Sequence, residues 1–418
     1  MPYDILVLGA TGFTGRLIVR YLNAHPQHRT SFSLGIAGRS QSKLDALKEQ
    51  EKLDDSITVV QVDVTQPSDI ERAVKDAKVV INTVGPFIRW GAPVVRACVE
   101  HNVHYVDITG EVPWIYDIIQ EFHDRALQNS TIVIPASGFD SVPSDYSAYL
   151  AHKALKSVAP NATMAETTSA FTLKAGISGG TLATVFEMLE VPRDKVKKSF
   201  ANFATSPVKG KSTPAFQISY RLPHLTPPVY GGTFVMSSAN RAIVQRTWGL
   251  QQQAGSASAY GPNFKYTEFM QTSGWLSGVV LSLTMAFGAM VLVALKPLRS
   301  LVQKYVAQPG QGPTQDELEN GFFKTVTVAS SDPLSETSAP VHVKSVFSAK
   351  GDGYLLTSVF TSEAALSILL DHDKLPTLGK QGGVLTPASA LGDVLYNRLM
   401  ATERFEEKWE QIDDKKSA

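Results

Sequence analysis

The chain opens with an unbroken apolar run that is followed at once by evenly spaced glycines. The run Ile5–Leu8 is typical of a central parallel strand that is buried on both faces. Beyond the glycines, apolar residues recur at helical spacing, at Leu17, Ile18, Tyr21 and Leu22. The pattern therefore predicts a strand, a glycine turn and a helix, in that order, at the start of the chain.

The same alternation of apolar runs and helical segments continues to residue 134. Five further strands are predicted over residues 31–37, 57–62, 79–82, 103–106 and 131–134. Six strands that alternate with helices predict an α/β fold, with a Rossmann-type doubly wound parallel sheet over residues 1–140.

Beyond residue 140 the pattern changes, and a second α+β domain is predicted over residues 141–400. We expect helices over residues 144–156 and 388–400 and strands over residues 163–173, 322–328, 341–347 and 354–360. This domain should bind substrate, and a homodimer contact through it is left open. Residues 401–418 are a charged tail, for which we expect a solvated helical end.

One uncharged stretch, residues 275–295, is closed by Lys296, Pro297 and Arg299. Its length reaches that of a bilayer span, although glycine and serine dilute it. A true span would also separate residues 300–418 from the first domain by a membrane. We therefore rank a monotopic hairpin or surface anchor first, a buried or oligomer-interface helix second, and a span third.

Composition narrows the class of protein. The 39 basic and 39 acidic residues give a formal net charge of zero, so no bulk charge favours nucleic acid. The single cysteine, Cys98, excludes an internal disulfide framework and a multi-cysteine metal site, and no metal is expected. No secretory signal precedes the first strand, which favours the cytoplasmic side. The ending KKSA, residues 415–418, fits the dilysine signal for retrieval to the endoplasmic reticulum, a pattern that also arises by chance.

The glycine turn predicts a dinucleotide site. Gly9 allows the tight turn, Gly12 lets the backbone approach a pyrophosphate, and Gly15 lets the helix lie against the strand. The spacing G-x-x-G-x-x-G is common where Rossmann domains bind NADP. The whole turn is expected to bind the cofactor phosphates: Gly9, Ala10, Thr11, Gly12, Phe13, Thr14 and Gly15.

Residues after the next strands predict the rest of the cofactor site. Arg39 and Ser40 follow the second strand, where NAD enzymes usually have an acid that binds the ribose hydroxyls. A guanidinium suits the 2′-phosphate instead, so NADPH is expected over NADH, although Arg39 could also be a solvated turn residue. Asp63 is expected beside the adenine, or as a helix cap. The nicotinamide half should lie at the loop formed by Thr83, Val84, Gly85 and Pro86.

The loop after the fifth strand carries the catalytic candidates Tyr105, Asp107 and Glu111. It should face the nicotinamide, because such loops gather at the carboxyl edge of the sheet. Proximity of the two carboxylates could raise the pKa of one, which would then act as an acid. The alternative is that they cap the helix that starts near residue 112. Asp140, after the sixth strand, is expected to bind substrate or, slightly more favoured, to cap the following helix.

A different catalytic layout competes with this one. Tyr149 and Lys153 are four residues apart on a predicted helix, and Ser137 lies upstream at the end of a strand. That order is typical of short-chain dehydrogenases, in which the tyrosine is the acid. Because Tyr-x-x-x-Lys is a short pattern, this is the minor alternative.

Several stretches resemble the saccharopine dehydrogenase-like oxidoreductases. They are GATGFTG (9–15), the run from Gly85 to Glu111, PASGFDSVPSD (135–145), PGQGPT (309–314) and GGVLTPASALGD (382–393). The resemblance implies an NADP-binding Rossmann domain and an α+β second domain. The family includes trans-acting enoyl reductases that serve polyketide synthases, and animal members on lipid droplets. It is also related to the enzymes that make saccharopine by imine reduction.

Together these features predict an NADPH-dependent oxidoreductase. The expected reaction is reduction of an activated C=C or C=N/C=O bond in an apolar acyl or polyketide-type substrate. The expected location is the cytoplasmic side, and association with the endoplasmic reticulum or with lipid droplets is left open. The alternative is a scaffold at such a surface, with a cofactor site that is non-catalytic or used for sensing.

Overall fold

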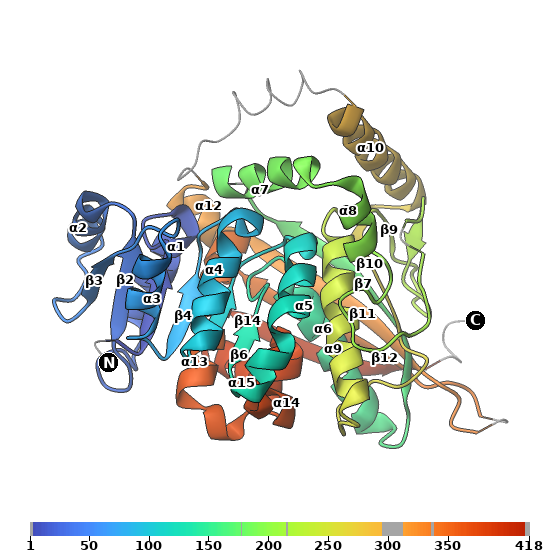
Figure 1. Ribbon diagram of the computed structural model, residues 1–418. Coiled ribbons are helices and arrows are strands. Elements are labelled where there is room, and N and C mark those ends of the chain that lie inside the picture. Colours follow the sequence, from blue (N-terminus) through green and yellow to red (C-terminus); the bar gives the residue numbers. More distant parts are fainter. Residues whose placement is uncertain (1–2, 177, 215, 295–311, 336–337, 414–418) are drawn as a thin grey trace.

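Two seven-stranded sheets form the framework of the protein (Figure 1). The computed structural model describes residues 3–176, 178–214, 216–294, 312–335 and 338–413. Part of the PGQGPT stretch, the basic residues that follow residue 295 and the KKSA ending lie outside the described residues.

The first sheet is entirely parallel and has the strand order β13-β6-β5-β4-β1-β2-β3. Its strands are β1 (Ile5–Leu8), β2 (Leu34–Gly38), β3 (Thr58–Gln61), β4 (Val79–Asn82), β5 (His104–Asp107), β6 (Ile132–Ile134) and β13 (Gly383–Val384). The first six strands have the doubly wound order of a Rossmann sheet, which confirms the predicted fold class. The reversal of strand order beside β1 creates the crevice in which such sheets bind ligands.

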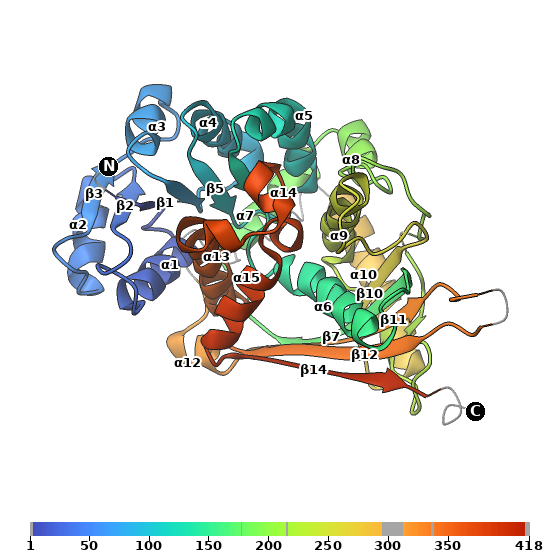
Figure 2. The ribbon, with the colours of Figure 1, turned by 90° about the horizontal axis from the view of Figure 1, so that it is seen from below.

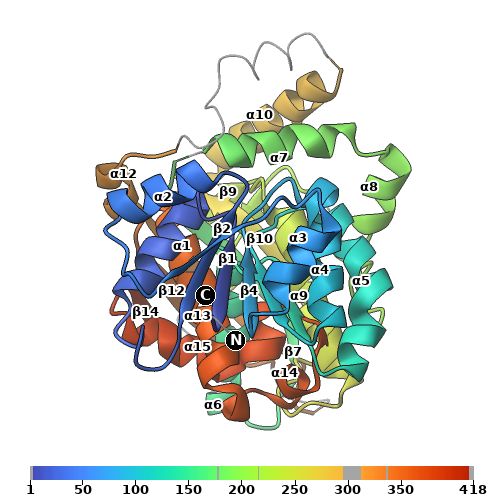
Figure 3. The ribbon, with the colours of Figure 1, turned by 60° about the vertical axis from the view of Figure 1, so that its left-hand side comes forward.

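Helices cover both faces of this sheet (Figure 3). On one face, Leu6, Leu8 and Val80 pack with α3 (Pro67–Val74), α4 (Phe87–Glu100) and α5 (Val112–Gln128). The opposite face packs with α1 (Phe13–Ala24), α2 (Gln41–Gln50), α13 (Gly353–Leu370) and α15 (Pro387–Ala401). The short η1 (His372–Lys374) and α14 (Thr377–Gln381) connect α13 to β13. Burial on both faces explains why these strands are continuous apolar runs.

The second sheet is mixed and has the order β14-β12-β11-β7-β10-β9-β8. Its strands are β7 (Met164–Lys174), β8 (Tyr220–Arg221), β9 (Tyr230–Gly232), β10 (Lys265–Gln271), β11 (Phe322–Ser331), β12 (His342–Lys350) and β14 (Phe405–Ile412). Only β7 and β10 pair in parallel. Helix α6 (Val142–Val158) lies over β11 and β12 and joins this sheet to the Rossmann sheet (Figure 2). The remaining helices are α7 (Gly179–Glu190), α8 (Arg193–Ser199), α9 (Ser237–Gln253), α10 (Trp275–Ala294) and α12 (Gln315–Glu319).

Three expectations about the C-terminal half are corrected. Residues 354–360 belong to the buried helix α13 and are not a strand. Residues 405–412 form the edge strand β14 and are not a helical end, because Phe405 is buried against the core. Residues 353–400, assigned to the second domain, pack on the Rossmann sheet and add β13 to it.

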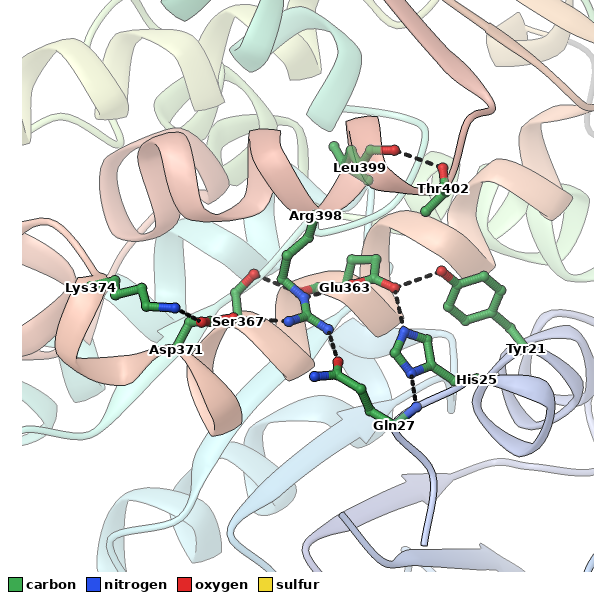
Figure 4. A network of polar contacts seen from close by, with 10 residues as sticks. All are labelled: Tyr21, His25, Gln27, Glu363, Ser367, Asp371, Lys374, Arg398, Leu399 and Thr402. Carbon is green, nitrogen blue, oxygen red and sulfur yellow. Dashed lines mark hydrogen bonds and ion pairs between the residues drawn. The ribbon is translucent and has the colours of Figure 1, made fainter. Parts of the chain in front are cut away.

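A buried polar cluster attaches these C-terminal helices to α1 (Figure 4). The carboxylate of Glu363 accepts a hydrogen bond from the Tyr21 hydroxyl (2.6 Å) and pairs with His25 Nε2 (3.2 Å) and Arg398 Nε (2.6 Å). Arg398 also pairs with Asp371 (2.8 Å). Burial alone would raise the pKa of Glu363, but the bond from His25 and the charge of Arg398 outweigh it and lower the pKa.

Among the residues that the structure describes, two helices are long and apolar enough to cross a membrane, α10 and α13. In α13, 78% of the most apolar window is buried, which identifies it as a core helix. In α10 only 11% of that window is buried. Burial in the core therefore explains the apolar composition of α13, but it does not explain that of α10.

Candidate functional site

The glycine turn lies at the carboxyl end of β1, where the Rossmann sheet changes strand order. Gly9 has a φ of +87°, a conformation that side chains other than glycine rarely adopt. The amides of Gly9 and Ala10 donate to the Ala37 carbonyl (2.9 and 3.0 Å), which fixes the turn to β2. Helix α1 then begins at Phe13 with Gly12 as its N-cap.

The third glycine brings helix and strand together. A Cβ on Gly15 would lie 2.2 Å from the Gly9 carbonyl oxygen, so no larger residue fits there. Gly12 is exposed, and no side-chain hydrogen bond caps the helix at this end. A helix N-terminus that is open and bare of side chains fits the diphosphate of a dinucleotide.

Three residues were expected at the adenosine end, and all three are exposed or only partly buried. Within the described residues, the guanidinium of Arg39 makes no ion pair, and its charge helps to lower the pKa of Asp63. Asp63 Oδ1 accepts hydrogen bonds from the Thr65 amide (2.9 Å) and hydroxyl (2.8 Å), which are the largest cause of its lowered pKa. Ser40 Oγ accepts from the Lys43 amide (3.4 Å) and so caps α2. Arg39 is therefore the residue with a charge free for a phosphate.

The loop after β4 is fastened to the glycine turn. Thr83 Oγ1 donates to the Leu8 carbonyl (2.9 Å), and Val84 N donates to the side chain of Asn82 (3.0 Å). Gly85 and Pro86 follow and lead into α4. The predicted cofactor residues from two separate loops are thus brought to one edge of the sheet.

The three predicted catalytic residues hold this edge together and do not line it. Glu111 is fully buried and accepts hydrogen bonds from the amides of Phe87 (2.8 Å) and Ile88 (2.7 Å) at the start of α4. Tyr105 is fully buried, and its hydroxyl accepts from Asn82 Nδ2 (3.1 Å). We therefore correct their assignment to positioning residues, because their polar atoms are enclosed by protein.

Asp107 is likewise enclosed. Its Oδ1 accepts from the amides of Thr109 (2.9 Å) and Ala136 (2.9 Å), which ties the loop after β5 to the loop after β6. Burial raises the pKa of Asp107 to about 7. With no exposed surface, this carboxyl stabilises the two loops and cannot touch a substrate.

Asp140 differs from these buried acids. It lies in the loop after β6, is only partly buried, and makes no hydrogen bond within the described residues. Helix α6 has Ser141 as its N-cap, so the capping role expected for Asp140 is wrong. Loss of hydration raises the pKa of Asp140 to about 6. The residue is thus only partly exposed, its carboxyl has no hydrogen-bond partner among the described residues, and its pKa is raised toward neutral pH.

Gly110 packs closely against this carboxyl. A Cβ placed on Gly110 would be 3.3 Å from Asp140 Oδ2 and 3.5 Å from Met236 Cε, so a side chain at this position would crowd both residues. The contact lies at the ends of β5 and β6, and the loop after β4, where the nicotinamide is expected, is next in strand order.

The second domain closes over the same edge. Helix α7 crosses the carboxyl ends of the Rossmann strands (Figures 1 and 3) and is joined to α4 by the Arg89–Glu187 ion pair (2.7 Å). The Tyr354 ring meets Phe13 edge-on at 5.4 Å, and Gly312 packs on Phe13. The spacing of apolar residues along the chain did not predict these contacts.

Asp140 could be recognised as a candidate from the GFDS stretch of the sequence. The sequence alone did not show that its carboxyl makes no hydrogen bond with the described residues.

The short-chain dehydrogenase layout is not assembled. Tyr149 and Lys153 both contact Asp393 of α15, and burial together with Asp393 raises the pKa of Tyr149. Ser137 donates to the Ile134 carbonyl (3.0 Å) and is fully buried. Tyr149 is two turns along α6 from the sheet edge, about 10 Å from its start.

The sequence is similar to known NADP-binding proteins, which agrees with the glycine turn described above. Residues 5–134 match the saccharopine dehydrogenase NADP binding domain. A Mycobacterium ulcerans (strain Agy99) protein named trans-acting enoyl reductase is 31% identical, over 96% of each chain. A Mycobacterium tuberculosis (strain H37Rv) protein provisionally given that name is 32% identical, also over 96% of each chain.

A solved structure shows the same architecture. The apo saccharopine dehydrogenase (L-Glu forming) of Saccharomyces cerevisiae superposes with a TM-score of 0.51 at 13% identity, covering 98% of this chain and 100% of that one. The matched NADP binding domain includes the glycine turn, Arg39 and the loop after β4. The chain therefore belongs to the saccharopine dehydrogenase-like family of NAD(P)-dependent oxidoreductases, with NADP(H) as its cofactor.

Proposed function

We propose that the protein is an NADPH-dependent enoyl reductase that reduces the C=C bond of an α,β-unsaturated acyl thioester. The observation that carries the proposal is the carboxyl of Asp140, which has no hydrogen-bond partner among the described residues and lies against Gly110, next in strand order to the loop expected to hold the nicotinamide. The names of relatives at 31 and 32% identity support the choice of an enoyl group over a carbonyl or imine.

Reduction of such a bond needs a hydride at the β-carbon and a proton at the α-carbon. NADPH, when bound, supplies the hydride. Hydride addition would leave an enolate, and its electron pair would form the new C–H bond at the α-carbon with the proton of the Asp140 carboxyl; the resulting carboxylate would regain a proton from solvent before the next turnover. The raised pKa keeps part of the Asp140 carboxyl protonated close to neutral pH. Met236 offers an apolar contact for the acyl chain.

Other residues position this chemistry. Glu111 fixes the first amides of α4, and Thr83 holds the nicotinamide loop against the glycine turn. Asp107 joins the two loops from which Gly110 and Asp140 project. Orientation by a rigid edge of the sheet is the main contribution of such residues.

Arg39 should select the phosphorylated cofactor. Replacing it, Arg39→Ala, removes a charge-assisted contact to the 2′-phosphate, so we expect the dissociation constant for NADPH to rise by roughly 10- to 100-fold. The constant for NADH should change by less than about threefold, because NADH lacks that phosphate. Calorimetric titration of both nucleotides measures the ratio. An equal loss for both nucleotides would contradict the assignment.

Turnover with a short probe tests the reaction type. Purified protein should consume NADPH with crotonyl-pantetheine or a longer 2-enoyl-pantetheine, and faster with the longer chain, because apolar surface is buried. The saturated thioester is the matched control and should give no consumption. Consumption with a 3-oxoacyl thioester or an imine, and none with the enoyl thioester, would refute the proposal while leaving the cofactor site intact.

A further inference from the structure

The exposed surface of α10 needs an explanation. Its outward side carries a stripe of large apolar side chains that are 43 to 65% exposed: Trp275, Leu276, Val280, Leu283, Phe287, Met290 and Val293. Soluble monomers rarely expose continuous apolar patches of this size. Residues 275–294 include no charged side chain at all.

Among the described residues, the buried contact of the helix with the body lies near its beginning. Gly278 and Ser282 are its buried residues, and the Thr233 amide donates to Ser282 Oγ (2.9 Å) beside β9. Gly278 also lies against Gly231, so the two backbones are in direct contact. Beyond this contact, α10 projects away from the rest of the protein (Figure 1).

The geometry points to a lipid bilayer as the occupant of this surface: we propose that α10 inserts its apolar side into the hydrocarbon region. The stripe runs along a helix of twenty residues, about 30 Å long, and a helix of this kind can lie along a bilayer surface with its apolar side inserted. Trp275 lies at the first end, and tryptophan favours the interface between lipid and water.

The alternative occupant, a second copy of the chain, fits less well. A helix seam between two proteins is narrow and is usually flanked by charged residues that set partner and register. On α10 the exposed positions beside the stripe include Thr284, Ala286 and Ala289, and no charge lies on any side. Because the positions beside the stripe are uncharged, the surface of α10 suits the hydrocarbon of a bilayer better than a second copy of the chain.

The contact is monotopic. The chain leaves the body after β10, which ends at Gln271, and Gly312 is back in the body, packed on Phe13. Residues on both sides of α10 therefore belong to one folded unit, with β11 pairing directly to β7. A single crossing of the bilayer between them would separate the two halves of a continuous sheet.

Vesicle flotation of the full chain tests the proposal. Wild-type protein should float with vesicles of pure phosphatidylcholine, which offer no net charge. The double variant Leu283→Glu/Phe287→Glu should lose partition by on the order of a hundredfold per carboxylate. The matched control Ile218→Glu/Leu334→Glu adds the same charge at other exposed apolar positions, 54 and 52% exposed, and should float as the wild type does.

The readout separates lipid binding from folding and from self-association. NADPH affinity and the urea midpoint of the double variant should equal those of the wild type, because the replaced side chains are exposed. The inference is independent of the proposed reaction, since flotation uses no substrate. Failure of the wild type to float would overturn it, and so would a wild-type dimer that the double variant converts to a monomer.

Discussion

Asp140→Asn should lower kcat by about 10²- to 10⁴-fold, the usual contribution of a positioned general acid. Asparagine keeps the shape of the side chain but has no carboxyl proton to give to the α-carbon. NADPH affinity should stay within about twofold, because Asp140 is outside the cofactor turn. Steady-state turnover of an enoyl thioester and calorimetric titration of NADPH measure the two effects.

The pH profile distinguishes an acid from a merely structural carboxylate. Asp140 must be protonated to act, and its pKa is about 6, so wild-type kcat/KM should fall as pH rises above that value. The residual activity of the variant should lack this decline. Asp124→Asn, at an exposed position of α5, is the matched control and should keep kcat within about threefold. A variant at position 140 with wild-type kcat would exclude the acid role.

Stability supplies a second check on the same substitution. Because folding raises the pKa of Asp140, the protonated group stabilises the folded state at low pH, and this contribution is lost as pH rises through about 6. The asparagine side chain of the variant cannot ionise in this desolvated position. The variant should therefore be at least as stable as the wild type at neutral pH in urea unfolding, which would show that lost activity is not lost folding.

Glu363→Ala should destabilise the protein by about 3 to 5 kcal/mol, the typical cost of breaking a buried ion pair from one side. The Glu363 side chain is only 2% exposed, so the variant leaves Arg398 and the Tyr21 hydroxyl without their shared acceptor in the protein interior. Urea unfolding measures the loss. Lys374→Ala is the control at the edge of the same cluster, and it should cost less than about 1 kcal/mol because Lys374 is exposed.

The acid sensitivity of this cluster has a defined sign. Folding lowers the pKa of Glu363. Its charged form therefore stabilises the folded state at pH values above the pKa of the unfolded chain, and this stabilisation is lost as the pH falls through the lowered pKa of the folded state. Between neutral pH and acid, the wild type should therefore lose more stability than the alanine variant. Equal losses, or a neutral-pH difference below about 1 kcal/mol, would mean that the cluster does not hold α13 and α15 on α1.

Much of the Rossmann half could be predicted because each clue is local. Strands buried on both faces leave apolar runs, and the turn that follows β1 needs glycine at Gly9 and Gly15 for reasons of φ and space. The C-terminal half lacks such clues. β13 has two residues, and its partner β6 is about 250 positions earlier in the chain. Helix α13 is buried on all sides, so its sequence has no polar face to reveal its period.

The site shows the same division. The sequence placed several carboxylates and hydroxyls at the correct edge of the sheet, but loop position alone does not show which of them are already used by the protein. Backbone amides bind both carboxylate oxygens of Glu111 and Oδ1 of Asp107, whose Oδ2 is buried without a partner, whereas no described amide binds the partly exposed carboxyl of Asp140. That difference depends on how two loops meet, which a single sequence does not encode locally.

The fate of hydride and proton in one turnover tests the central claim most directly. With NADPH that carries deuterium at the transferred position, and crotonyl-pantetheine as substrate, the saturated product should contain one deuterium, at the β-carbon. In deuterated water with unlabelled NADPH, the deuterium should be at the α-carbon, and Asp140→Asn should slow product formation in both experiments. Deuterium on the carbonyl carbon, or none in any product, would contradict enoyl reduction at this site.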